Sequence, residues 1–238
     1  CGHDGPPPDL ARRGANVVNG TPHSGHPSAG KLTHSGSLCT ATLIGSKTVL
    51  TAAHCVSPGH SHTFSAGGAS YSSTAVHRHP KYSSYSITYD IAVVLLSSAP
   101  PLAPATVNTT PPTVGMPITI VGYGKTSEYT SNAGYKRMAT STISQVTPTR
   151  IGMPASKTKG NVCNGDSGGP SYAMVGGQEV QVGVHSTKSG ICGSGGHDTR
   201  VDVFVGWIAQ VAAGDVNRPG GTAPGPDAGA PPRPGADG

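Results

Sequence analysis

The stretch GDSGGP, residues 165–170, places a single serine on a turn built largely from glycine. Glycine beside Ser167 leaves the hydroxyl open to a ligand and lets neighbouring backbone N–H groups point at one spot. A serine hydroxyl is a weak nucleophile until a base removes its proton. The stretch therefore predicts chemistry only if the chain also supplies a histidine and a carboxylate that orients it.

Two apolar segments upstream supply candidates for both partners. TAAHC (51–55) places His54 at the end of an apolar stretch, beside a cysteine that can tether it. YDIAVVLL (89–96) places Asp90 directly before a strongly apolar run, where a carboxylate is costly to bury unless it is paired. The chain has 11 histidines, so His54 alone identifies nothing, and the case rests on the order His, Asp, Ser.

The 238-residue chain has the composition of an all-β protein, with 35 glycines, 22 prolines and few stretches suited to long helices. One segment, VDVFVGWIAQVAAG (201–214), has apolar residues at helical spacing and is predicted as a terminal helix ending at Gly214. Five segments rich in β-branched residues and bounded by Gly, Pro or Ser are predicted as strands: 37–45, 48–54, 91–96, 118–124 and 179–186. Many short strands favour a β-barrel or sandwich.

Both ends of the chain differ from this pattern. Residues 1–16 contain three consecutive prolines and no apolar periodicity, and they are predicted as a disordered lead-in or propeptide. The segment 214–238 is rich in proline and glycine, and is predicted as a disordered tail. Between them, residues 17–213 form the folded part.

Composition also excludes some classes of function. The formal charge of +5 comes from 16 basic and 11 acidic residues, but the basic residues are scattered, so we expect no nucleic-acid partner. No run of 18 apolar residues is present, so a transmembrane helix is excluded.

Five cysteines are present, and no two of them form a C-x-x-C pair, which argues against a thiolate zinc site. Cys39 can pair locally with Cys55 and Cys163 with Cys192, which leaves Cys1 over, although the sequence alone allows other pairings. Disulfides would indicate an oxidising compartment.

TAAHC, DIAVVLL and GDSGGP resemble, in this order, the three catalytic blocks of the chymotrypsin/trypsin-like serine endopeptidases. VVNG (17–20) resembles the mature N-terminus of that family, and TRVDVFVGWI (199–208) resembles the segment entering its C-terminal helix. The resemblance covers about residues 17–213. It implies two six-stranded antiparallel β-barrels with the active site between them, a short C-terminal helix, and the disulfides Cys39–Cys55 and Cys163–Cys192.

The resemblance implies a role for each catalytic residue. Ser167 attacks the scissile carbonyl of a protein or peptide substrate, His54 takes and returns the proton, and Asp90 holds the imidazole tautomer. The N–H groups of Gly165 and Ser167 form the oxyanion hole, and Ser186 contacts the aspartate. No metal or organic cofactor is implied, and the enzyme is expected to be a monomer.

Specificity departs from the well-known members of the family. Asn161 occupies the pocket floor, six residues before the nucleophile, where trypsin-type enzymes have aspartate. His185 matches a wall position that is also histidine in some bacterial glutamate-specific members, whereas Asp198 matches a floor-lining position. Either His185 favours acidic side chains, or Asp198 favours basic ones, or the two pair and neutralise the pocket. Lys188 adds a positive charge at the pocket mouth, beside Ser186, and we expect acidic or polar residues to be preferred over basic ones.

In this family a newly cut N-terminal amine pairs with the aspartate before the nucleophile. Here that pair would be Val17 and Asp166, and the 16 preceding residues make the chain resemble a zymogen. A cut after Asn16 is unusual, and Arg12-Arg13 is a more obvious target for an activating protease, with trimming to follow.

Cys1, followed by a proline-rich tether, resembles a mature bacterial lipoprotein. On this hypothesis Cys1 carries lipid and attaches the enzyme to a membrane of the bacterial cell envelope, and a cut before Val17 releases it. A free Cys1 on a secreted protein is the alternative.

Two other function classes compete with the endopeptidase. One is a surface binding protein on an inactive protease scaffold, which the three triad residues argue against. The other is an α/β-hydrolase esterase with His185 or His197 as its base, which lacks the required alternation of strands and long helices.

Overall fold

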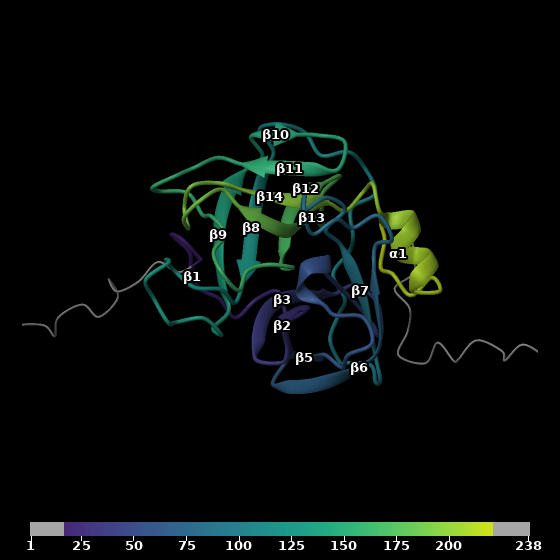
Figure 1. Ribbon diagram of the computed structural model, residues 1–238. Helices are drawn as coiled ribbons and strands as arrows, with labels where there is room; N and C mark the ends of the chain where they lie inside the picture. Colours follow the sequence, from purple (N-terminus) through teal and green to yellow (C-terminus); the bar gives the residue numbers. More distant parts are fainter. Residues whose placement is uncertain (1–16, 221–238) are drawn as a thin grey trace, which may run out of the picture.

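The computed structural model describes residues 17–220 and contains two antiparallel β-sheets (Figure 1). The first sheet is a closed barrel with the strand order β2-β3-β4-β7-β6-β5. It is closed by the pairing of β5 with β2. Its strands are β2 (Ala29–His34), β3 (Ser37–Leu43), β4 (Thr48–Thr51), β5 (Thr63–Ala66), β6 (Ala69–Arg78) and β7 (Ala92–Leu96).

The second sheet has eight strands in the order β1-β9-β8-β12-β13-β14-β11-β10. Its strands are β1 (Thr21–Pro22), β8 (Pro117–Gly122), β9 (Arg137–Thr142), β10 (Gln145–Val146), β11 (Arg150–Met153), β12 (Pro170–Val175), β13 (Gln178–Lys188) and β14 (Gly196–Arg200). The all-β class is confirmed, and each of the five predicted strand segments contains a strand.

The predicted architecture of two barrel-like halves is confirmed, with the second half formed by an eight-stranded half-barrel in which no ladder pairs the edge strands. Only Ile143 and Ser144 separate β9 from β10, although these strands lie near opposite edges of the sheet. The chain therefore crosses from one edge to the other by a bend, in which Ser144 N–H donates to Gly152 O at 2.8 Å. A connection of two residues forces the sheet to curl, because the linked ends of β9 and β10 must lie close together.

Three hairpins share the same turn chemistry. The two-residue loops Ser35-Gly36, Gly67-Gly68 and Gly176-Gly177 join β2 to β3, β5 to β6 and β12 to β13. All six residues have positive φ, which is the type I′ geometry that matches the twist of the flanking strands. These turns set the register of both sheets.

One short helix, α1 (Val205–Val211), follows the second sheet. The predicted helix began at residue 201, but residues 202–204 form a turn instead. At its other end Ala213 and Gly214 have positive φ, and Gly214 N–H donates to Ala209 O at 2.8 Å, which closes the helix. No helix in the described part of the chain is long and apolar enough to cross a membrane.

The folded part extends beyond its predicted end at residue 213. The Asp215 carboxylate accepts hydrogen bonds from the backbone N–H groups of Ser46 and Lys47 and from the Thr48 hydroxyl, at 2.7, 2.9 and 2.8 Å. Val216 is buried in the core. The start of the predicted tail is therefore packed against the first barrel, whereas residues 221–238 lie outside the described residues.

One apolar cluster joins the two sheets and the helix. It contains Ile44, Leu50 and Ile91 from the first barrel, Val107 and Val184 from the second half, and Phe204, Ile208 and Val216 from the C-terminal segment. Each sheet also encloses its own apolar cluster. The interface between the halves is therefore apolar and closely packed. Such packing can hold residues from both halves in one geometry.

Both predicted disulfides, Cys39–Cys55 and Cys163–Cys192, are formed. The predictions that concern residues 1–16, including the lead-in, Cys1 and the Arg12-Arg13 pair, lie outside the described residues.

Candidate active site

His54 and Asp90 meet where the two halves join. His54 lies on the single-turn helix η2 (Ala53–Cys55), directly after β4, and the Cys39–Cys55 disulfide ties that turn to β3. His54 Nδ1 lies 2.7 Å from Asp90 Oδ2, and the His54 backbone N–H donates to Asp90 Oδ1 at 2.9 Å. These two contacts orient the imidazole, whose Nε2 lies 3.7 Å from the disulfide-bonded Cys55 Sγ.

Asp90 has further partners from the second half. The Ser186 hydroxyl of β13 donates to Asp90 Oδ2 at 2.6 Å, and the Thr199 hydroxyl of β14 donates to the Asp90 carbonyl at 2.9 Å. Asp90 is fully buried, which by itself opposes ionisation, but the bonds from His54 and Ser186 outweigh this and lower its pKa. The carboxylate is therefore charged at neutral pH.

The backbone just before Asp90 is held in an uncommon conformation. Tyr89 has a φ of 53°, a left-handed value that is rare for a bulky residue. Its ring stacks on that of His79 at 5.2 Å, and His79 packs edge-on against Phe204 and Trp207 at the start of α1. This aromatic cluster fixes the entry of the chain into the site.

Ser167 is brought to the same joint by its backbone. Thr40 N–H of β3 donates to Ser167 O at 2.9 Å, and Gly168 N–H donates to His185 O at 2.7 Å. Gly168 must be glycine, because it has a φ of 80° and a Cβ there would collide with Thr51 and Thr40. Within residues 17–220 the Ser167 hydroxyl has no hydrogen bond, so the contact between Ser167 and His54 is not closed in this structure.

The two N–H groups predicted for the oxyanion hole are also without an acceptor in the described part of the chain. Those of Asp166 and Gly169 donate within the same loop, to Cys163 O and Asp166 O. Gly165 has a φ of 96°, and a Cβ there would lie 2.9 Å from Gly124. The loop thus leaves the N–H groups of Gly165 and Ser167 available beside the Ser167 side chain.

A cavity of about 250 Å³ opens beside Ser167. Three of the five predicted specificity residues line it: His185, Ser186 and Lys188. Asn161 does not, because it is fully buried and its side-chain amide donates to Pro154 O at 2.9 Å. The other lining residues are Val162, Cys163, Asn164 and Thr187.

Asp198 does not line the cavity either, because it is buried and paired with His185, which forms part of the cavity wall. It lies directly opposite His185 in the β13–β14 ladder, and His185 Nδ1 is 2.9 Å from Asp198 Oδ1. Both side chains are almost fully buried. Burial favours neutral His185, but the charge and hydrogen bond of Asp198 raise its pKa overall. Of the three alternatives left open by the sequence, the structure shows the pairing.

Similarity to known proteins agrees with this geometry. The family model described as Trypsin matches residues 16–208, most of the chain. The chain belongs to the trypsin family of serine proteases. It is 31% identical to "Serine protease SP24D" of Anopheles gambiae over 229 residues, covering 82% of this chain and 81% of that protein. It is 29% identical to "Trypsin-1" of Salmo salar over 205 residues, covering 74% and 81%.

Solved structures share this trypsin-like fold. Mouse neuropsin, described as a serine protease expressed in the limbic system of the brain, superposes with a TM-score of 0.72 at 22% identity, covering 81% of this chain and 98% of its own. A structure titled HBP gives 0.71 at 22% identity, covering 82% and 96%. The named relatives come from a fish and a mosquito, so they lend no support to a bacterial source.

Asp166 is, with Asp90 and Asp198, one of three fully buried aspartates in the described part of this trypsin-family chain. It accepts N–H groups from Gly124 at 2.8 Å and Cys163 at 2.9 Å, but no cationic group of the described residues forms an ion pair with it. Burial raises its pKa to about 6, although the charges of His185 and Arg137 and the two N–H bonds act in the opposite direction. A buried carboxylate without an ion pair among the described residues therefore lies directly before Ser167 in the chain.

Sequence reasoning missed Glu128, in the segment between β8 and β9. Its carboxylate contacts Lys188 Nζ, and accepts hydrogen bonds from Cys192 N–H at 3.1 Å and the Asn164 amide at 3.2 Å. Glu128 and Lys188 are partly exposed, at 23% and 27%. Nothing in its local sequence marks Glu128 as part of the site.

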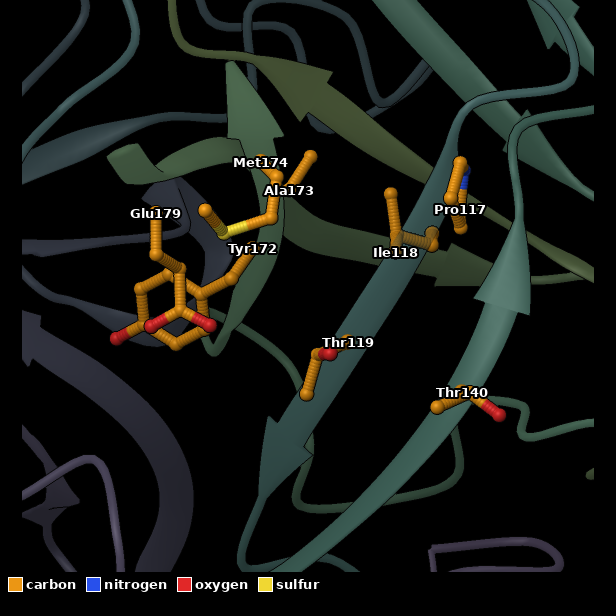
Figure 2. Close-up of a pocket in the computed structure, with 8 residues that line it drawn as sticks. All are labelled: Pro117, Ile118, Thr119, Thr140, Tyr172, Ala173, Met174 and Glu179. Carbon is orange, nitrogen blue, oxygen red and sulfur yellow. The ribbon is translucent and has the colours of Figure 1, made fainter. Parts of the chain in front are cut away.

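Other features of the structure do not add to the site. Cys39, His54 and Cys55 lie within metal-ligand distance of one another, but both cysteines are in a disulfide, which removes their thiolates. A cavity of about 190 Å³ lies on β8, β9, β12 and β13, with Tyr172 and Glu179 at one side and Ile118 at the other (Figure 2). It contains none of the triad residues.

The raised pKa of Asp166 predicts a pH-dependent stability. The native state keeps the Asp166 proton up to about pH 6, while the unfolded state releases it near pH 4, so this group lowers the free energy of unfolding as pH rises between these values. Asp166→Asn removes the effect. We expect the stability of Asp166→Asn relative to wild type to rise by about 2 kcal/mol from pH 4 to pH 7.

Denaturant unfolding of both proteins across this pH range measures the difference. Glu179→Gln, which removes the charge of a carboxylate that is 46% exposed, serves as the control. A stability difference between Asp166→Asn and wild type that is independent of pH would contradict the raised pKa.

Proposed function

We propose that this protein is a serine endopeptidase that uses Ser167, His54 and Asp90. The observation that carries the proposal is the contact of His54 with a buried, ionised Asp90, at the joint where the backbone also holds Ser167. Asp90 accepts a hydrogen bond from Nδ1–H of His54, which leaves Nε2 unprotonated and able to act as the base. A catalytic histidine needs this tautomer.

The proposed reaction follows from these positions. His54 Nε2 takes the proton of Ser167 as its oxygen bonds to the scissile carbonyl carbon, and the carbonyl oxygen becomes an oxyanion. The N–H groups of Gly165 and Ser167 stabilise that charge, each by roughly 3 kcal/mol. His54 then gives its proton to the leaving amine as the C–N bond breaks. Water repeats the sequence on the acyl-enzyme and releases the second product.

Removal of the nucleophile tests this proposal. We expect Ser167→Ala to lower kcat/KM by at least about 10⁴-fold, because the covalent step is lost while the fold is kept. Mass spectrometry of a mixed peptide library after incubation measures cleavage by the 238-residue chain and by a chain that starts at Val17. Ser97→Ala, an exposed serine after β7, is the control. Absence of cleavage by both wild-type chains would favour the alternative of a binding protein on an inactive protease scaffold.

For specificity, we propose a preference for acidic or polar residues over basic ones before the cut. Asp198 would have to face the substrate to select arginine or lysine, but it is fully buried and held by His185. The cavity wall instead presents His185, Ser186 and Thr187, and its mouth presents Lys188. Asn161 supplies no charge at the floor position.

The same library distinguishes the two pocket groups. We expect His185→Ala to reduce the preference for acidic and polar residues over arginine and lysine by about tenfold. His197→Ala, which changes a histidine that does not line the cavity, should leave the preference unchanged. The proposal fails if Asp198→Asn abolishes cleavage after arginine and lysine while His185→Ala has no effect.

For activation, we propose that a cut before Val17 frees an amine that pairs with Asp166. Val17 is already buried, and Val18 forms a bridge with Asn161 in the second sheet, so the segment is held on the correct half of the molecule. Asp166 offers a buried carboxylate that lacks a cationic partner in residues 17–220. The disulfides indicate that this takes place in an oxidising compartment.

A chain that starts at Val17 should therefore be more active than the chain with residues 1–16. We expect at least about a tenfold higher kcat/KM, because an amine beside Asp166 stabilises the ionised carboxylate and shifts the loop population toward the competent form. The gain should vanish in a Val17-started chain with Asp166→Asn. Equal activity of the long and short chains would exclude this mode of activation.

A further inference from the structure

The rim of the cavity beside Ser167 is built to hold a carboxylate. Three donors converge there from segments that already belong to the site. They are the ammonium group of Lys188 at the end of β13, the amide of Asn164 in the nucleophile loop, and the backbone N–H of Cys192. Lys188 and Asn164 line the same cavity as Ser167.

The carboxylate that these donors hold belongs to the chain itself. Glu128 Oε1 receives Lys188 and Cys192 N–H, and Glu128 Oε2 receives Asn164, so both oxygens are used. Glu128 lies on the segment between β8 and β9, which contributes no residue to the triad. The hydrogen bond from Lys188 lowers the pKa of Glu128, so the carboxylate is ionised at neutral pH.

We propose that Lys188, Asn164 and Cys192 N–H form a binding site for an acidic side chain of the substrate, and that Glu128 occupies it as an internal competitor. This inference rests on the proposed endopeptidase function and specifies its substrate class. A substrate carboxylate can replace Glu128 with no change in the number of charges at the rim.

Three features favour competition over a purely structural pair. The three donors satisfy one carboxylate fully. When Glu128 moves away, Lys188 is left charged and without a carboxylate. An incoming acid is therefore favoured over an amide of the same shape. Glu128 and Lys188 are both partly exposed, so water and substrate reach them. Pairs of this kind exchange readily, because an exposed ion pair is weak.

The chain offers a matched control, because it contains only two glutamates, Glu128 and Glu179. Glu179 is the second residue of β13, whereas Lys188 is the last, and it pairs with His26 at 3.1 Å. Glu128→Gln and Glu179→Gln therefore change the net charge equally and differ only in the contact they remove.

The test compares peptides that are identical except for Glu or Gln at one position before the cut, scanned over four positions. The measured quantity is kcat/KM for the Glu peptide divided by kcat/KM for the Gln peptide. At one of the four positions, we expect Glu128→Gln to raise this ratio by about fivefold or more, mainly by lowering KM for the Glu peptide. Glu179→Gln should leave the ratio unchanged. Lys188→Gln should bring the ratio close to one, and the double variant should behave like Lys188→Gln. High salt should reduce the effect.

The inference is overturned if Glu128→Gln accelerates cleavage of Glu and Gln peptides equally, or has no effect at any position. A second readout is independent of catalysis. In a Ser167→Ala background, fluorescence anisotropy measures binding of a labelled Glu peptide and its Gln counterpart to the Glu128 and Lys188 variants. If no form cleaves any peptide but the Glu peptide still binds more tightly in Glu128→Gln, the carboxylate site stands and the endopeptidase proposal fails.

Discussion

The structure depends on a fully buried carboxylate at the joint between its two halves. Asp90 comes from the first barrel, and a lone charge in that position would be expelled from the protein interior or protonated. It is kept ionised by donors from both sides: His54 from the first half and Ser186 from the second. Because each half supplies part of this solvation, the halves can dock only in one relative position without leaving a charge unsatisfied.

Asp166 shows the opposite response to burial. Both carboxylates accept N–H groups, but the pKa of Asp90 is lowered and that of Asp166 is raised. The difference lies in the partners: an imidazole and a hydroxyl contact Asp90, whereas only two peptide N–H groups contact Asp166. The ionised form is thus favoured at Asp90 and disfavoured at Asp166. A new cation beside Asp166 would favour its ionised form.

The sequence predicts the parts of the fold whose signals are local. Strands such as IAVVLL carry their own β-branched pattern, and both disulfides join cysteines that lie close in the chain, although only the family resemblance selected these pairings. The eight-stranded sheet was not predicted, because β1 and β10 have only two residues each and no periodicity of their own. Their pairing is decided by tertiary contacts.

The same distinction applies to the candidate site. His54, Asp90 and Ser167 lie in distinctive motifs, and the structure brings His54 and Asp90 into contact. The His185–Asp198 pair remained one of three alternatives until the register of β13 and β14 placed the two residues opposite each other. Glu128 had no signal at all, because its partners Asn164 and Lys188 are 36 and 60 residues away along the chain.

The pairing of the first described residues has a consequence for how the chain folds during synthesis. Thr21 pairs with Met138, and Val18 pairs with Asn161, although the whole first barrel lies between them in the sequence. The N-terminal segment must therefore wait, without its partners, until most of the chain has left the ribosome. Contacts of such long range make folding slow. Residues 18–22 leave the ribosome before both of their partners, and they are therefore among the last of the described residues to reach their native contacts.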